Sequence, residues 1–120
     1  MTILKLRLLF DGAMFGPGKA ELLAGIARTG SIAAAGRDMG MSYKRAWMLV
    51  EEMNAAFTEP LVTRARGGPG GGGAHLTETG QRVLQLYHVI LEQTLAASAQ
   101  EIAALETMLA AKGKPGVTDG

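Results

Sequence analysis

The chain contains no cysteine, only two histidines and no long hydrophobic run. The lack of cysteine excludes a disulfide framework and thiolate metal sites. His75 and His88 are too few for a histidine metal site unless subunits share ligands. No run of about 18 apolar residues is present to span a membrane, and the N-terminus lacks the basic and apolar regions of a signal peptide. We therefore expect a soluble, cytoplasmic protein.

Aromatic residues are also scarce, with one Trp, two Tyr and three Phe among 120 residues. Hydrophobic residues make up 48% of the chain and are mostly Ala, Leu and Met, a mixture that favours helices over sheets. This is enough apolar material for one globular domain. The net charge is only +1, but residues 1–76 carry nine Lys/Arg against six Asp/Glu, whereas residues 77–109 carry one against four. A basic front half weakly favours a surface that meets phosphate.

Alternation and turn residues mark the first elements of the chain. Residues 3–10 alternate basic and apolar side chains, which predicts a short strand with one wet face. Asp11-Gly12 and the Gly-Pro-Gly of residues 16–18 then break the chain. Residues 19–28 carry an apolar stripe at helical spacing, and Gly30 lies where a C-terminal cap is expected.

Two serines mark the starts of the next two helices. Ser31 predicts the N-cap of a short, alanine-rich helix over residues 32–39, which Gly40 ends. Ser42 predicts the N-cap of a longer helix. Its apolar positions follow helical spacing and define one buried face, made of Ala46, Leu49, Val50, Met53 and Phe57. A tight turn between two capped helices sets them at a steep angle, so that the first braces the second.

A glycine-rich ribbon and a long helix follow. Residues 61–66 and 74–76 read as two strands around the loop GGPGGGG, with Arg64 and Arg66 on one side of the first strand. Thr77 is then the expected cap of a helix that runs to about residue 109. Such a helix is far longer than is usual in a small domain.

An apolar stripe at heptad spacing runs along the expected long helix. The register passes through Leu84, His88, Leu91, Leu95, Ser98, Ile102, Leu105 and Leu109. Because a domain that ends at residue 76 cannot bury this stripe, we expect a homodimer with an interface made of Leu84, Leu91, Leu95, Ile102 and Leu105. The predicted organisation is a globular domain over residues 1–76, a dimerisation helix over 77–111 and a flexible tail over 112–120.

The order of these elements is that of a winged helix-turn-helix, a mainly α fold with a small β component. In that arrangement the second helix of the motif enters the major groove of double-stranded DNA with its N-terminus first. Tyr43, Lys44 and Arg45 follow the Ser42 cap and place donors at this end, beside free backbone N–H groups that favour phosphate. Lys44 or Arg45 can reach a guanine edge, while the ribbon arginines can reach the DNA backbone or an adjacent minor groove.

Residues 30–47, GSIAAAGRDMGMSYKRAW, and residues 67–80, GGPGGGGAHLTETG, resemble ModE-type molybdate-responsive regulators. The resemblance covers roughly residues 10–90. It implies a sequence-specific transcription regulator with a LysR-type helix-turn-helix. The DNA-contacting positions of the family fall on Ser31, Ser42, Tyr43, Lys44, Arg45, Arg64 and Arg66.

The sequence also departs from the ModE-type pattern. Full-length members continue into oxyanion-binding domains, and nothing in these 120 residues resembles that sensor. We therefore expect no cofactor in this chain, and regulation by molybdate does not transfer to it. A separate sensor or regulator protein is a further partner to consider.

Other interpretations stay open at this point. A winged-helix protein-interaction module would bind a partner protein and have no DNA target of its own. In that case Arg64 and Arg66 are the wet face of an edge strand, and Lys44 and Arg45 are ordinary solvated charges. An enzyme is not expected, because no Ser–His–Asp set, paired carboxylates or metal spacing emerges. Trp47, on a helix flank, is predicted to pack against the ribbon.

Overall fold

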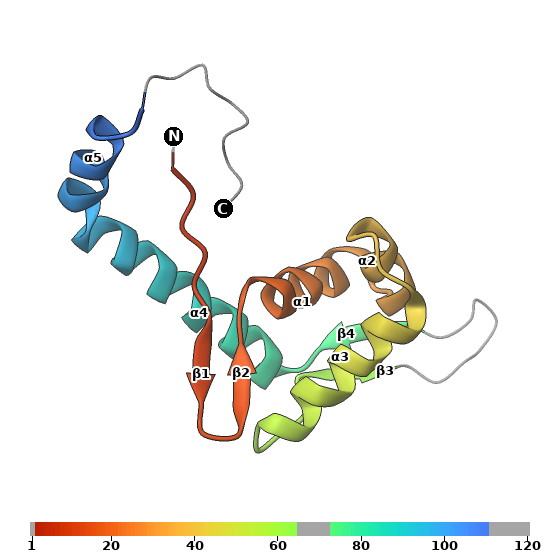
Figure 1. Ribbon diagram of the computed structural model, residues 1–120. Helices are drawn as coiled ribbons and strands as arrows, with labels where there is room; N and C mark the ends of the chain where they lie inside the picture. The colour runs from red at the N-terminus through yellow and green to blue at the C-terminus, as the bar shows by residue number, and fades with distance from the viewer. Residues whose placement is uncertain (1, 65–72, 111–120) are drawn as a thin grey trace.

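The computed structural model describes residues 2–64 and 73–110, which form five helices and two small antiparallel sheets (Figure 1). In chain order the elements are β1 (Leu8–Phe10), β2 (Ala13–Phe15), α1 (Pro17–Thr29), α2 (Ile32–Asp38), α3 (Tyr43–Ala56), β3 (Val62–Arg64), β4 (Ala74–Leu76), α4 (Glu78–Ala97) and α5 (Ala99–Thr107). The predicted class, mainly α with a small β component in winged helix-turn-helix order, is confirmed. Residues 67–72 of the glycine-rich loop, Arg66 and the predicted tail lie outside the described residues.

The N-terminus folds as a hairpin where the sequence predicted a single strand. β1 pairs antiparallel with β2, so that Leu8 lies opposite Phe15. The predicted strand over residues 3–10 is too long, since only its last three residues are β-structure. Asp11-Gly12 makes a turn rather than a break, because Gly12 takes a left-handed conformation with φ of 90° that returns the chain onto itself. The hairpin places Phe15, 2% exposed, in the core.

Small residues let the first three helices pack closely. A Cβ placed on Gly25 of α1 would lie 3.0 Å from the Cβ of Ala35 on α2. A Cβ on Gly36 of α2 would lie 2.7 Å from the Cβ of Ala46 on α3. Because neither pair leaves room for a larger side chain, α2 is held tightly between its two neighbours. This packing sets the angle at which α3 leaves the core.

The two predicted N-caps are confirmed. The Ser31 hydroxyl accepts a hydrogen bond from the Ala34 N–H at 2.9 Å, and the Ser42 hydroxyl accepts one from the Arg45 N–H at 3.0 Å. Gly30 closes α1 in the left-handed conformation and donates its N–H to the Ile26 carbonyl. The start of each helix was therefore encoded by residues next to it in the chain.

α4 packs on the core of its own chain. Tyr87 is 3% exposed, and its ring lies edge-on to Phe15 with centroids 5.2 Å apart. Its hydroxyl donates to the Leu6 carbonyl at 2.6 Å, which holds the N-terminal segment alongside α4 (Figure 1). Leu84 and Leu91 are half-buried against the same core. Part of the predicted dimer stripe is thus already covered within the chain itself.

The predicted continuous helix to residue 109 is wrong. Helix α4 ends at Ala97, and α5 begins at Ala99 after a break at Ser98, whose ψ is 14°. The hydroxyls of Thr94 and Ser98 donate to the carbonyls four residues earlier, at 2.7 Å each. Such back-bonding competes with the helical ladder and bends or breaks helices. The predicted heptad register therefore does not continue from α4 into α5.

Candidate nucleic-acid interface

The start of α3 presents polar side chains to solvent. Ser42 caps the helix, and Tyr43, Lys44 and Arg45 follow it with exposed side chains; Tyr43 is 52% exposed. The first backbone N–H groups of a helix have no partner within it, and the helix dipole adds partial positive charge there. Two cations at this end therefore reinforce a field that attracts phosphate.

The opposite face of α3 is the reason these side chains point outward. Ala46, Leu49, Val50 and Met53 are all buried, at 0–8% exposed. They form the stripe that the sequence predicted, and Phe57, just after the helix, is half-buried beside them. Since this stripe is held by the core, α3 cannot rotate about its axis. The face that carries Lys44 is therefore fixed toward solvent.

Trp47 connects α3 to the β3–β4 ribbon. The guanidinium carbon of Arg64, on β3, lies 5.5 Å from the centroid of the Trp47 ring. A cation over an aromatic face at this distance is attracted by the ring quadrupole. Trp47 is half-buried and packs on the ribbon, as the sequence predicted. Arg64 stays exposed, as the wet face of an edge strand requires, while its guanidinium contacts the Trp47 ring.

Asn54 makes a second connection between α3 and the ribbon. Its Oδ1 accepts hydrogen bonds from the backbone N–H groups of Leu61 at 2.8 Å and Val62 at 3.1 Å. Its Nδ2 donates to the Val62 carbonyl at 3.1 Å. Sequence reasoning did not assign this role to Asn54. Asn54 lies outside the two quoted stretches that resemble ModE-type regulators, residues 30–47 and 67–80.

These two connections define how the ribbon lies against α3. Trp47 and Asn54 are seven residues apart, which is about two helical turns and places them on one face. Val62 is held at Asn54 and Arg64 at Trp47, so β3 runs back along α3 toward its N-terminus. Lys44 lies one turn before Trp47. The fold therefore gathers Lys44, Trp47 and Arg64 on one surface.

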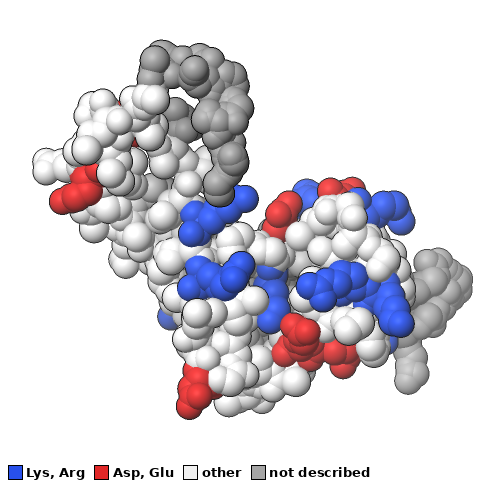
Figure 2. Space-filling model, viewed as in Figure 1, with Lys and Arg blue, Asp and Glu red and all other residues white. Residues whose placement is uncertain are grey.

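Charge is distributed unequally along α3. Its N-terminal turn carries two cations, and its second half carries Glu51 and Glu52. The Glu52 carboxylate pairs with Lys19 at 3.3 Å, and Lys19, only 8% exposed, also donates to the Met14 carbonyl. Figure 2 shows basic side chains gathered over the part of the molecule where α3 begins, with acidic side chains further along. The N-terminal end of α3 is thus the end suited to a polyanion.

The remaining predictions concern Ser31, Arg66 and the residues of the expected dimer interface. Ser31 is half-buried, and its hydroxyl is engaged in capping α2. Arg66 lies outside the described residues. Of the predicted dimer residues, Leu95 is 38% and Leu105 62% exposed, and Ile102 is half-buried.

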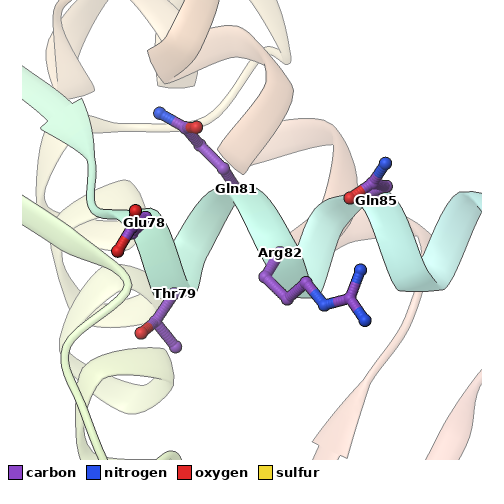
Figure 3. Close-up of a pocket in the computed structure, with 5 residues that line it drawn as sticks. All are labelled: Glu78, Thr79, Gln81, Arg82 and Gln85. Atoms are coloured by element: carbon purple, nitrogen blue, oxygen red, sulfur yellow. The ribbon is translucent and has the colours of Figure 1, made fainter.

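The shallow hollow at the start of α4 is lined by Glu78, Thr79, Gln81, Arg82 and Gln85, whose side chains diverge along one helix (Figure 3). The described residues hold no group of three or more His, Asp or Glu placed for a metal ion. None of their helices has both the length and the apolar character needed to cross a membrane.

Comparison with known proteins identifies the family. Residues 18–81 match the model of the bacterial regulatory helix-turn-helix proteins of the lysR family. The chain is 49% identical over 79 residues to the molybdenum-pterin-binding protein MopB of Rhodobacter capsulatus, which covers 66% of this chain and 29% of that protein. It is 49% identical over 76 residues to the DNA-binding transcriptional dual regulator ModE of Escherichia coli K12, covering 63% and 29%. The chain thus spans under a third of the length of these relatives.

The fold also has a counterpart among solved structures. The DNA-binding domain of CbnR, solved in a complex with DNA, superposes with a TM-score of 0.58 at 22% identity. The match covers 73% of this chain and 95% of that one. The resemblance to ModE-type regulators that residues 30–47 and 67–80 indicated is confirmed. On this evidence the chain belongs to the lysR family of bacterial regulatory helix-turn-helix proteins.

Proposed function

We propose that this chain is a sequence-specific, DNA-binding transcription regulator that acts as a dimer. One observation carries the proposal: Lys44 and Arg45 stand exposed at the capped start of α3, and Trp47 holds Arg64 against the same helix. An interaction module has no need to gather cations in this way. Bacterial DNA lies in the cytoplasm, so the proposal also places the protein there.

The start of α3 and the ribbon take different tasks in this proposal. The N-terminal turn of α3 enters the major groove, where Arg45 or Lys44 donates to the acceptors on a guanine edge. Tyr43 and the Ser42 cap lie beside phosphate. Arg64 stands on the ribbon and donates to the DNA backbone, which sets register without reading sequence. The relatives' molybdenum chemistry is not extended to this chain, because the match covers only 29% of their length.

A DNA titration tests this division. Duplexes selected from genomic fragments by the immobilised protein are titrated by fluorescence anisotropy, beside duplexes of random sequence. Arg45→Ala should cost about 1–3 kcal/mol on the selected site and much less on random DNA. Arg64→Ala should weaken both and lower the salt slope by about one. Arg82→Ala, an exposed charge on α4, is the matched control and should change neither.

Several outcomes contradict the proposal. A DNA affinity that does not depend on salt would show that α3 does not recognise DNA. An Arg45→Ala effect no larger than that of Arg82→Ala would show the same. The chain then fits an interaction module instead. The exposed hairpin side chains Leu9 and Phe10, at 76% and 51%, are the observation that favours this second candidate.

The proposed dimer forms through the apolar side chains that stay exposed on α4, on α5 and in the two residues that follow α5. Leu95 is 38% exposed, and Leu105, Met108 and Leu109 are 62–77% exposed. Full burial of one such side chain is worth roughly 1.5–3 kcal/mol. A second copy that presents the same residues covers them by a two-fold interface. The half-buried Leu84 and Leu91 contribute less, because their own core already contacts them.

Sedimentation equilibrium tests the dimer. The wild-type chain should have twice its mass of 12.5 kDa at tens of micromolar, and Leu105→Glu should return it to that mass. Leu9→Glu is the matched control, because Leu9 is a more exposed leucine on the hairpin. A monomeric wild-type chain contradicts the proposed dimer, and so does a Leu105→Glu chain that stays dimeric.

A further inference from the structure

We infer that Trp47 is a positioning residue for DNA binding, which holds the Arg64 guanidinium beside the start of α3 with its N–H donors free for phosphate. The inference rests on the proposed function and deepens it. It assigns to Trp47 a role other than core packing or direct contact with a base.

The contact between the two residues leaves the cation available. A guanidinium carries five N–H donors, and an aromatic ring whose centroid lies 5.5 Å from the guanidinium carbon does not occupy all of them in place of phosphate. A carboxylate partner would instead occupy the donors and cancel the charge. The described residues show two ion pairs, Lys19–Glu52 and Arg28–Asp38, and Arg64 belongs to neither.

The backbone leads the Arg64 side chain to the ring. Val62 and Arg64 are two residues apart on β3, so their side chains leave the same face of the ribbon. Val62 is 3% exposed and faces the core, and Asn54 holds its backbone. Arg64 therefore leaves β3 on the side of α3, where the half-buried Trp47 ring is the surface that receives it.

The consequence is a set of cations arranged before DNA arrives. A free arginine side chain samples many rotamers, and binding must select one of them. An Arg64 side chain held at Trp47 has lost part of that freedom, and Trp47 lies about one helical turn from Lys44. Binding therefore gains affinity from a smaller ordering cost rather than from an additional contact.

A double-mutant cycle on DNA affinity tests the inference. The variants are Trp47→Leu, Arg64→Ala and the pair, each titrated with a random-sequence duplex at low salt. Trp47→Leu should weaken binding about fivefold in the wild-type background and less than twofold in the Arg64→Ala background. Trp47→Phe keeps an aromatic face and should restore most of the affinity. Additive effects overturn the inference, and so does a Trp47→Phe chain as weak as Trp47→Leu.

The single tryptophan supplies a second measurement that needs no change in the core. Acrylamide should quench the fluorescence of Arg64→Ala more strongly than that of the wild type, because the guanidinium no longer covers the ring. Arg82→Ala should leave quenching unchanged. Equal quenching in all three proteins overturns the inference even if Trp47→Leu fails to fold. If quenching behaves as expected but the wild type binds no duplex, the stack stands and the proposed function fails.

Discussion

Asn54 is the residue whose loss most directly tests how the ribbon is attached to α3. Its side chain makes three hydrogen bonds, at 2.8, 3.1 and 3.1 Å, to the backbone of Leu61 and Val62. These two residues are 0% and 3% exposed. Asn54→Ala therefore leaves two N–H groups and one carbonyl without the partner that satisfied them in the fold.

The magnitude follows from these bonds. Each is worth about 1 kcal/mol net, which gives about 3 kcal/mol for the three. Alanine is the better helix former by about 0.5 kcal/mol, and this offsets part of the loss. We expect Asn54→Ala to lower the free energy of unfolding by about 2–3 kcal/mol, a large part of the 5–15 kcal/mol that holds an ordinary domain together.

Urea denaturation followed by circular dichroism measures this loss. Glu51→Ala, at an exposed position on the same helix, is the control and should stay within about 0.5 kcal/mol of the wild type. If the free energy of unfolding of Asn54→Ala is equally close to that of the wild type, the three Asn54 hydrogen bonds do not hold β3 on α3. The account of how Arg64 reaches Trp47 then fails with it.

Two further variants test contacts elsewhere in the fold. A Cβ on Gly80 would lie 2.1 Å from the Leu61 carbonyl oxygen, so Gly80→Ala should destabilise the protein by about 1–3 kcal/mol in thermal unfolding; an unchanged melting temperature would refute the close approach. Burial raises the pKa of Tyr87 above its ordinary value of 10.0. At a pH between the pKa of the unfolded state and that of the folded state, the folded protein keeps the Tyr87 proton and the unfolded protein releases it. The free energy of unfolding should therefore fall as pH rises beyond 10. Tyr87→Phe should cost about 1 kcal/mol at neutral pH and lose this alkaline component, and an unaltered alkaline slope contradicts the assignment.

Local signals explain why much of the fold was predictable. Ser31 and Ser42 are followed by helices because a cap needs only the next three residues. The buried face of α3 was readable from helical spacing, and the exposed positions of Lys44 and Arg45 followed from it. Both the order of the elements and the cationic start of α3 are thus contained in short stretches of sequence.

The features that escaped prediction depend on contacts distant in the chain or on competing hydrogen bonds. Tyr87 meets the Leu6 carbonyl, 81 residues earlier, which no local pattern indicates. This contact draws α4 onto its own core and covers part of the stripe that suggested a dimer. The break at Ser98 arises where hydroxyls compete with the helical ladder, although the apolar spacing continues past it.

The central claim is that the start of α3 and the ribbon form the surface that meets DNA. An NMR titration of the ¹⁵N-labelled chain with a random-sequence duplex at low salt tests it without knowledge of the operator, because phosphate contacts dominate such binding. Amide shifts should concentrate in residues 42–48, 62–64 and 74–76 and reverse on addition of salt, while residues 99–107 stay unchanged. Shifts confined to α5 and the N-terminal hairpin, with residues 42–48 unaffected, would contradict the account.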